Sequence, residues 1–119
     1  EPYRRQRQMC IRAGVDIIKI SRAKDLHDDF PYRILSSEEL DRYLSFADDE
    51  ENKARFLATR WAAKEAYVKA SNNRKIDFRS ISVMNDENGK PTLKFNNKII
   101  GEVSLSHDDY AIAFVLLKE

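Results

Sequence analysis

The chain has 119 residues, and its 21 Lys and Arg nearly balance 20 Asp and Glu, which gives a net charge of +1. This length favours a single domain whose core is thin for an enzyme with a cofactor-sized cleft, so we expect an oligomer that builds sites between its subunits. The charge balance argues against a general nucleic-acid binder, which carries a clustered basic excess.

The cysteine content and the hydropathy restrict the compartment. Cys10 is the single cysteine, which rules out an internal disulfide and a cysteine-based zinc site. It suits a reducing compartment, the cytoplasm or alternatively the mitochondrial matrix. No apolar run approaches the roughly 18 residues of a membrane span, and no signal peptide is visible. Residues 1–8 begin without Met, and we expect them to be a flexible lead-in of a trimmed or excised chain.

The N-terminal part predicts one strand followed by helices. Residues 9–20 are rich in Ile and Val and predict a strand, which Asp16 interrupts with a charge. Residues 21–30 predict a short helix that leads into a loop around a proline. Ser36 and Glu39 have the spacing of a capping box, so a second helix should run from there to residue 47.

The remaining chain predicts a long helix and then strands. The acidic residues 48–51 suit the start of a helix that runs to residue 71. Strands are predicted at 81–85, 92–95, 99–106 and 110–117. The Asn-Gly pair at 88–89 supplies the positive φ angles of a hairpin turn. Strand, helices and then an antiparallel meander indicate an α+β fold, with the C-terminal strands packed on the long helix.

The most informative stretch is WAAKEAYVKA, residues 61–70 of the long helix. At about 100° per residue, its small and aromatic side chains fall on one side. They are Ala63, Ala66, Tyr67 and Ala70, joined by Phe56. Glu65 and Lys69 fall on the opposite side, near Trp61. This pair is either a weak surface ion pair or part of a site for a metal ion and phosphates.

The same charged residues have a chemical interpretation when Asp16 is added. Asp16 and Glu65 are hard oxygen ligands that can share a Mg²⁺ ion, which takes one or two protein carboxylates. Lys64 and Lys69 can neutralise phosphates as point charges. The alternative for Asp16 is that it caps the segment after the strand.

Three other positions have weaker signals. Gly14 would let the backbone approach a ligand closely. His107 lies in a polar turn at a strand end, where functional side chains are common but where a plain surface residue is also expected. We expect His27 to be solvated. The Phe and Tyr residues of the final strands are expected in the core, not as a stacking platform for nucleic acid.

Two motifs, Gly14-Val15-Asp16 and residues 61–69 (WAAKEAYVK), stand in a fixed order with further matching context at 33–36, 89–91 and 104–107. Together they resemble the holo-acyl-carrier-protein synthase family, the short-chain type of 4′-phosphopantetheinyl transferase. The resemblance covers about residues 14 to 115.

The resemblance implies a Mg²⁺-dependent enzyme of lipid metabolism that transfers phosphopantetheine from coenzyme A to a serine of an apo acyl-carrier protein and releases 3′,5′-ADP. It also implies the fold of that family and a homotrimer with sites at the subunit interfaces. The alternative is a non-catalytic coenzyme-A-binding or carrier-docking domain of a larger fatty-acid or polyketide synthase.

The resemblance further implies roles for single residues. Asp16 and Glu65 look like the metal ligands, and Lys69 and Lys64 look like pyrophosphate contacts, so that Asp16, Glu65 and Lys69 form the catalytic set. A neighbouring subunit would bind the nucleotide end of coenzyme A through Lys90, Pro91, Ser106 and His107. A metal-bound water or Glu65 would take the serine proton.

Carrier docking is implied for the basic and apolar residues Arg22, Leu26 and Arg33, which would face an acidic helix of the carrier. Asp28 and Asp29 oppose that charge sense. Two further departures from the family pattern stand out. Residues 71–75 lack the glycine that often follows the long helix, and Ile18 stands where larger relatives carry another acidic residue.

Overall fold

The structure, a computed structural model, describes residues 12–26 and 29–117. The elements in chain order are β1 (Arg12–Lys19), α2 (Ile20–Lys24), α3 (Phe30–Ile34), α4 (Ser37–Ser45), α5 (Glu50–Ser71), the 3₁₀ helix η1 (Phe78–Ser80), β2 (Ile81–Asn85), β3 (Pro91–Phe95), β4 (Lys98–His107) and β5 (Tyr110–Leu117). The predicted lead-in 1–8, Cys10, His27 and Asp28 lie outside the described residues.

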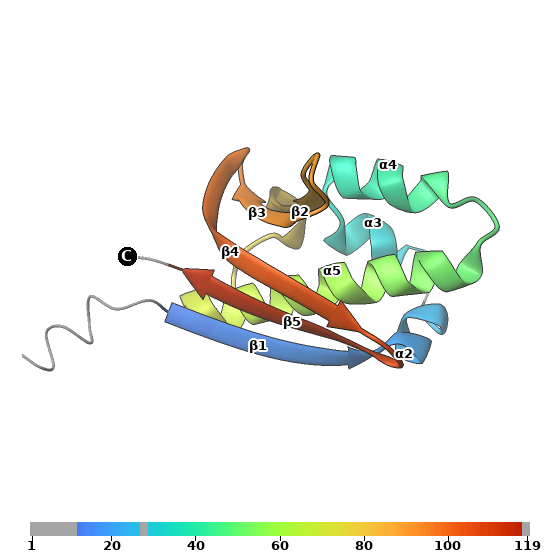
Figure 1. The fold of residues 1–119 in the computed structure, drawn as a ribbon, viewed down its shortest axis with the longest axis horizontal. Helices are drawn as coiled ribbons and strands as arrows, with labels where there is room; N and C mark the ends of the chain where they lie inside the picture. The colour runs from blue at the N-terminus through green and yellow to red at the C-terminus, as the bar shows by residue number, and fades with distance from the viewer. Residues whose placement is uncertain (1–11, 27–28, 118–119) are drawn as a thin grey trace, which may run out of the picture.

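One five-stranded antiparallel sheet, in the order β1-β5-β4-β3-β2, supports the helices. The central helix α5 lies along one face of the sheet and is flanked by α2, α3 and α4 (Figure 1). Small residues make this contact close, because Ala62, Ala63 and Ala66 of α5 and Ala111 and Ala113 of β5 are fully buried. The predicted α+β fold with strands packed on a long helix is confirmed.

Local sequence explains where the helices begin and end. The capping box at α4 is present, since Ser36 N donates to Glu39 Oε1 at 2.8 Å and Glu39 N donates to Ser36 Oγ at 3.3 Å. Asn72 ends α5 with a φ of 58°, a left-handed cap that Asn tolerates and Gly more often provides. Asn72 therefore does locally what a glycine in the 71–75 loop would do.

The segment around Pro31 differs from the prediction. It forms the helix α3 instead of a loop, with Pro31 in its first turn. A proline at that position costs no hydrogen bond and its fixed φ suits a helix start. None of the helices within 12–26 and 29–117 is long and apolar enough to cross a membrane.

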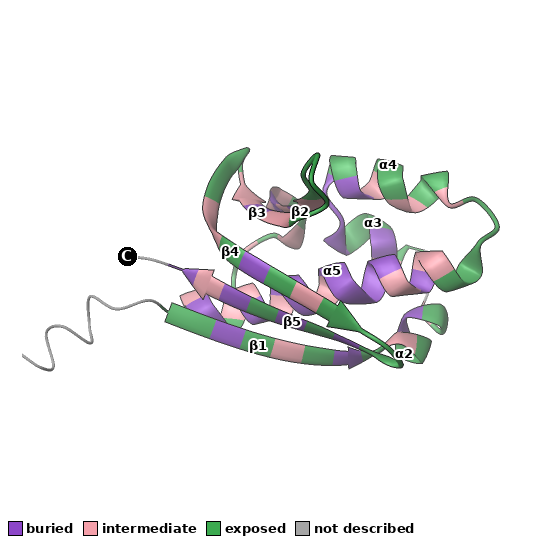
Figure 2. Cartoon of the chain, viewed as in Figure 1, coloured by how far each residue is buried: buried purple, intermediate pink, exposed green. Residues whose placement is uncertain are grey.

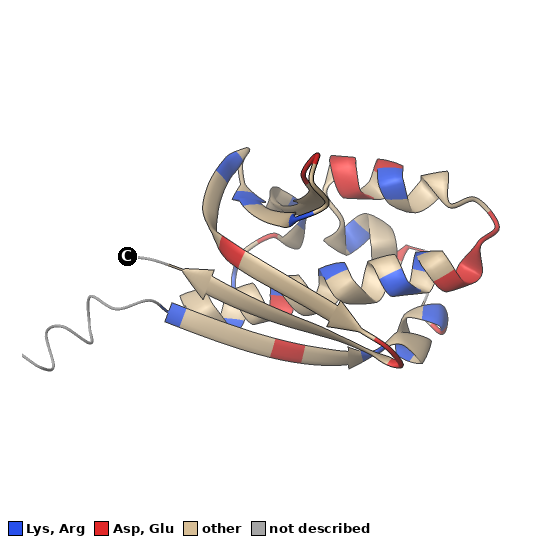
Figure 3. Cartoon of the chain, viewed as in Figure 1, with Lys and Arg blue, Asp and Glu red and all other residues tan. Residues whose placement is uncertain are grey.

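On β1 and β5, the outer face of the sheet, away from α5, carries exposed apolar side chains. They are Val15, Ile17, Tyr110, Ile112 and Phe114. Figure 2 shows how buried and exposed residues alternate along β1 and β5, and Figure 3 shows that β5 carries no charge. The prediction that the aromatic residues of the final strands belong to the core is therefore wrong for Tyr110 and Phe114. Because side chains alternate along a strand, Tyr110 and Phe114 lie on the face of β5 opposite to the one that holds the buried alanines.

Candidate active site

Asp16, Glu65 and Lys69 come together where β1 crosses α5. Lys69 Nζ donates to Asp16 Oδ1 at 2.9 Å and to the Val15 carbonyl oxygen at 3.1 Å. The Lys69 side chain is 56% exposed and that of Asp16 15%. Glu65 lies one turn before Lys69 and is half-buried. The structure thus groups two carboxylates and one ammonium group at the edge of the sheet.

The charges in this group act on each other. Burial raises the pKa of the Glu65 carboxyl above its usual value, the negative charge of Asp16 raises it further, and the Lys69 ammonium partly opposes both. Two carboxylates that repel each other in this way favour the binding of a cation between them.

Gly14 explains why Asp16 reaches this position. A Cβ atom at Gly14 would overlap the Ala66 carbonyl oxygen and lie 2.8 Å from the Ala70 backbone nitrogen. The strand therefore touches the helix backbone at this point. The expectation that Gly14 makes room for a ligand is wrong, since α5 itself fills that space. Asp16 lies two residues further and on the same side of the strand, so it faces α5.

The donor set fits Mg²⁺. Among the described residues, no group of three or more His, Cys, Asp or Glu side chains is placed to hold a metal ion. Ile18, where a third carboxylate would stand, is buried in the core. Two carboxylates suit Mg²⁺, which keeps water and substrate phosphates as its other ligands, and do not suit structural zinc, which takes four protein ligands.

Lys64 lies inside the protein, although it precedes Glu65 directly. Its ammonium group donates to the Ile34 carbonyl oxygen at 2.6 Å, to the Phe78 carbonyl oxygen at 2.9 Å and to Glu39 Oε1 at 2.5 Å. The side chains of Lys64 and Glu39 are both 0% exposed. Because all three ammonium hydrogens have partners, Lys64 has none left for a phosphate. The expectation that it contacts pyrophosphate is wrong.

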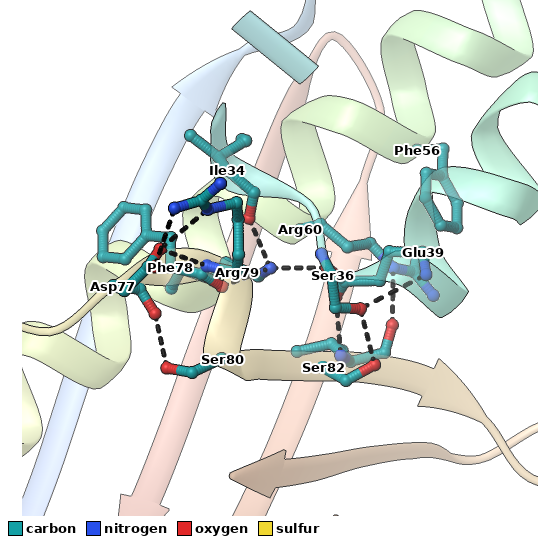
Figure 4. A network of polar contacts seen from close by, with 12 residues as sticks. Ile34, Ser36, Glu39, Phe56, Arg60, Asp77, Phe78, Arg79, Ser80 and Ser82 are labelled. Atoms are coloured by element: carbon teal, nitrogen blue, oxygen red, sulfur yellow. Dashed lines mark hydrogen bonds and ion pairs between the residues drawn. The ribbon is translucent and has the colours of Figure 1, made fainter. Parts of the chain in front are cut away.

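Glu39 completes this buried network, which Figure 4 shows from close by. Its carboxylate also accepts hydrogen bonds from the backbone nitrogens of Ser36, at 2.8 Å, and Val83, at 2.6 Å. Burial lowers the pKa of Lys64, and Glu39 opposes that shift. The pair therefore joins the start of α4 and strand β2 to the central helix. Sequence reasoning missed this partner, although the capping box had already singled out Glu39.

A cavity of about 500 Å³ lies between α4, α5, the β2–β3 turn and the end of β4. Its lining includes the predicted residues Pro91 and His107 together with Arg42, Arg55 and Arg60. Sequence reasoning missed these three arginines, because no spacing relates 42 to 55 and 60 until α4 packs on α5. The cavity has the charge of an anion-binding site.

Stacking on aromatic rings fixes two of these arginines. The Arg60 guanidinium lies 4.1 Å from the Phe56 ring centre and that of Arg42 lies 4.6 Å from the Phe46 ring centre. Arg60 Nε also donates to the Val83 carbonyl oxygen at 3.0 Å. Burial is the main reason that the pKa of Arg60 is lowered to about 10. The negative charge of Glu39 opposes this shift, and the positive charge of Arg42 adds to it. The Arg60 guanidinium remains cationic at neutral pH.

The other predicted coenzyme A contacts lie outside this cavity. Lys90 is exposed and donates to Glu102 Oε1 at 3.2 Å. Ser106 lies on the outer face of β4, opposite Ile112. Neither Asp16 nor Glu65 lines the cavity. The two halves of the predicted site therefore lie apart within one chain.

Two of the predicted carrier-docking residues, Arg22 and Arg33, lie around Trp61 and Phe30. The Arg22 guanidinium of α2 lies 5.0 Å from the Trp61 ring centre. The Arg33 guanidinium of α3 lies 5.7 Å from the centre of Phe30, whose ring meets that of Trp61 edge-on at 4.9 Å. Leu26 is partly buried against the core.

Comparison with known proteins identifies the family. A sequence profile of the 4′-phosphopantetheinyl transferase superfamily matches residues 12–115, so the chain belongs to that superfamily. It is 41% identical over 118 residues to a holo-[acyl-carrier-protein] synthase from Geobacillus sp. (strain WCH70), covering 92% of this chain and 98% of that protein. It is 45% identical over 107 residues to the synthase from Mycoplasma mobile, covering 89% and 88%. The crystal structure of a holo-(acyl-carrier-protein) synthase from Bacillus anthracis in complex with CoA (3′,5′-ADP) superposes with a TM-score of 0.80 at 35% identity, covering 91% and 96%.

Proposed function

We propose that this protein transfers 4′-phosphopantetheine from coenzyme A to a serine of an apo acyl-carrier protein and releases 3′,5′-ADP. The observation that carries the proposal is the group of Asp16, Glu65 and Lys69, held together by the contact of Gly14 with α5, in a chain of this superfamily. The non-catalytic alternative has little use for a paired carboxylate site.

The reaction is the attack of the serine hydroxyl on the β-phosphate of coenzyme A, which breaks the bond to the 3′,5′-ADP oxygen. Asp16 and Glu65 would hold a Mg²⁺ ion, which supplies charge neutralisation to the pyrophosphate. Lys69, exposed and next to Asp16, places a second positive charge beside the same oxygens. Stabilising developing negative charge is the main task of the protein in phosphoryl transfer.

The cavity between α4 and β4 would bind the nucleotide end of coenzyme A. Arg42 and Arg60 have guanidinium groups fixed by stacking, and His107 lines the same cavity with Pro91. Fixed cations suit a phosphate because little side-chain entropy is lost on binding. We assign the 3′-phosphate to this cavity, with Lys90 and Ser106 outside it.

A homotrimer would join the two halves of the site. The exposed apolar outer face on β1 and β5, with Ile17, Ile112 and Phe114, is of the kind that marks a subunit contact. In such a trimer, Asp16 and Glu65 of one subunit would share one site with His107 of another. The compartment stays a prediction: the cytoplasm, or alternatively the mitochondrial matrix.

The direct test is incubation of the protein with coenzyme A, Mg²⁺ and several apo carriers, from fatty-acid, polyketide and mitochondrial systems, followed by mass spectrometry of the carrier. We expect one phosphopantetheine group to be added to at least one carrier, with 3′,5′-ADP released in equal amount. Binding of coenzyme A without transfer to any carrier would instead support the non-catalytic docking module.

A further inference from the structure

We propose that Glu39 is a positioning residue for coenzyme A, because it holds the edge of strand β2 and the Arg60 guanidinium in the geometry that meets the 3′-phosphate. This inference rests on the proposed function, since it concerns the cavity that we assign to the nucleotide end of coenzyme A. Glu39 itself does not line that cavity, so it would act on the phosphate only through Arg60.

Glu39 and Arg60 are joined through the backbone of one residue, Val83 of β2. The Val83 N–H donates to Glu39 Oε2 at 2.6 Å, and the Val83 carbonyl oxygen accepts a hydrogen bond from Arg60 Nε at 3.0 Å. Strand β2 is the edge strand of the sheet, next to β3, and an edge strand leaves such backbone groups without a partner in the sheet. One side chain from α4 and one from α5 therefore bind the same point of this edge.

The charge of Glu39 also supports Arg60. Arg60 and Lys64 stand one turn apart on α5, where side chains are neighbours, and both are buried, so their positive charges repel each other. Glu39 pairs directly with Lys64 at 2.5 Å. Burial lowers the pKa of Arg60, and the negative charge of Glu39 opposes that shift. Without Glu39, two neighbouring cations would stay buried together, and we expect the Arg60 guanidinium to move toward water.

Arg60 is fixed in one orientation and keeps donors for a ligand. Its Nη1 donates to Thr59 Oγ1 at 3.0 Å, and its guanidinium lies 4.1 Å from the Phe56 ring centre (Figure 4). The N–H groups of Nη2 have no partner among residues 12–26 and 29–117. Because Arg60 lines the cavity, these donors are available to a phosphate, and a preorganised fork loses little entropy on binding one.

A purely structural role of Glu39 would have a different consequence. A loss of stability lowers the amount of folded protein, which weakens the binding of every ligand of the folded state by the same factor. A misplaced Arg60 affects only ligands that carry the 3′-phosphate. The ratio of two affinities, for coenzyme A and for its 3′-dephospho analogue, therefore separates positioning from stability.

The test is calorimetric binding of coenzyme A and of 3′-dephospho-coenzyme A, with Mg²⁺ and without a carrier. The wild type should bind coenzyme A more tightly, and the ratio of the two dissociation constants measures recognition of the 3′-phosphate. Glu39→Gln should lower this preference about tenfold, the effect of weakening one hydrogen bond to a charged group. The control is Ser82→Ala, which removes a neighbouring contact of β2 with α4, Ser82 Oγ to Ser36 Oγ at 2.9 Å, and should leave the preference unchanged.

A comparison in the Lys64→Met background removes the effect of stability. Lys64→Met leaves Glu39 in place, so it should destabilise the fold and yet keep the wild-type preference. Adding Glu39→Gln removes the unpaired buried charge, so the double variant should be the more stable of the two but should have a preference about tenfold lower. If Glu39 served stability alone, the more stable protein would not discriminate less.

A double-mutant cycle tests whether Glu39 acts through Arg60. In an Arg60→Gln background, Glu39→Gln should leave the preference for coenzyme A unchanged, because the residue that it positions is already lost. Additive effects of the two substitutions would overturn the positioning role.

The outcomes distinguish this inference from the proposed function. A 3′-phosphate preference that depends on Glu39, in a protein that transfers nothing to any carrier, would refute the proposed function alone. Transfer with an unchanged preference in Glu39→Gln would refute the positioning role alone. Equal affinity of the wild type for the two ligands, or equal preference in Lys64→Met and the double variant, would also overturn the positioning role.

Discussion

Glu65→Gln should lower phosphopantetheine transfer by about 10²- to 10³-fold, the usual cost of removing one group that stabilises charge in the transition state. The shape of the side chain is kept, but one of the two charges that would bind Mg²⁺ is lost. The measurement is the rate of carrier modification at saturating coenzyme A. Glu51→Gln, an exposed carboxylate in the first turn of the same helix, is the control and should retain full activity.

The same substitution should not harm the metal-free fold. Burial and Asp16 raise the pKa of Glu65, so the folded state holds more protons than the unfolded state just above the usual Glu value of 4.5. Stability is therefore lost as the pH rises through that window. Glu65→Gln removes this loss, so at pH 7 without metal it should unfold at the same or a higher temperature than the wild type.

Added Mg²⁺ with coenzyme A should raise the unfolding temperature of the wild type and have a smaller effect on Glu65→Gln, because a ligand stabilises only the state that binds it. Equal stabilisation of both proteins by Mg²⁺ would exclude Glu65 as a metal ligand, whatever the activity shows.

Lys64→Met should lower the free energy of unfolding by about 3–5 kcal/mol, since it leaves the Glu39 carboxylate buried without its cation. The two side chains are both 0% exposed, so water cannot replace the lost partner. Chemical denaturation at one protein concentration measures the change. A loss of this size is a large part of the stability of an ordinary domain, so the Lys64→Met variant should be partly unfolded.

Lys69→Met is the matched control, with the same substitution on the same helix and a carboxylate partner at 2.9 Å. Because Lys69 is 56% exposed, the change in stability should be below about 1 kcal/mol. A double variant, Glu39→Gln with Lys64→Met, should recover part of the loss by removing the unpaired charge. Equal destabilisation by the two Lys substitutions would contradict the assignment of Lys64 to the core.

Much of the fold could be predicted from local sequence. The capping box of Ser36 and Glu39 and the acidic start of α5 each specify their own backbone, and the structure has both. The turn at 88–89 also forms, but only Gly89 has the predicted positive φ, whereas Asn88 does not. Pro31 misled the prediction because a proline is compatible with both a loop and a helix start.

The candidate site was harder to predict because packing decides which neighbours of a motif face outward. Lys64 and Glu65 are adjacent in sequence, yet the helical rotation sends one to the core and the other to the surface. The glycine of the first motif serves the contact of β1 with α5, which no pattern within the strand reveals. The arginines of the cavity come from two helices whose packing the sequence does not specify.

The burial of the aromatic residues in the final strands could not be predicted from the sequence either. Tyr110 and Phe114 alternate with Ala111 and Ala113, and the period of two separates the faces correctly. It does not say which face is covered by α5. The small residues face the helix because only they permit its close approach, which leaves the large ones outside.

We propose that one site combines Asp16 and Glu65 of one subunit with His107 of its neighbour. In the proposed homotrimer, co-expression of Glu65→Gln and His107→Ala subunits with different tags, followed by two-step purification, would yield mixed trimers. Each mixed trimer should contain one complete site, so activity should return to about one third of the wild-type value, whereas each parent variant alone is inactive. Mixed trimers as inactive as the parents would show that the residues act within one chain and would contradict the shared site.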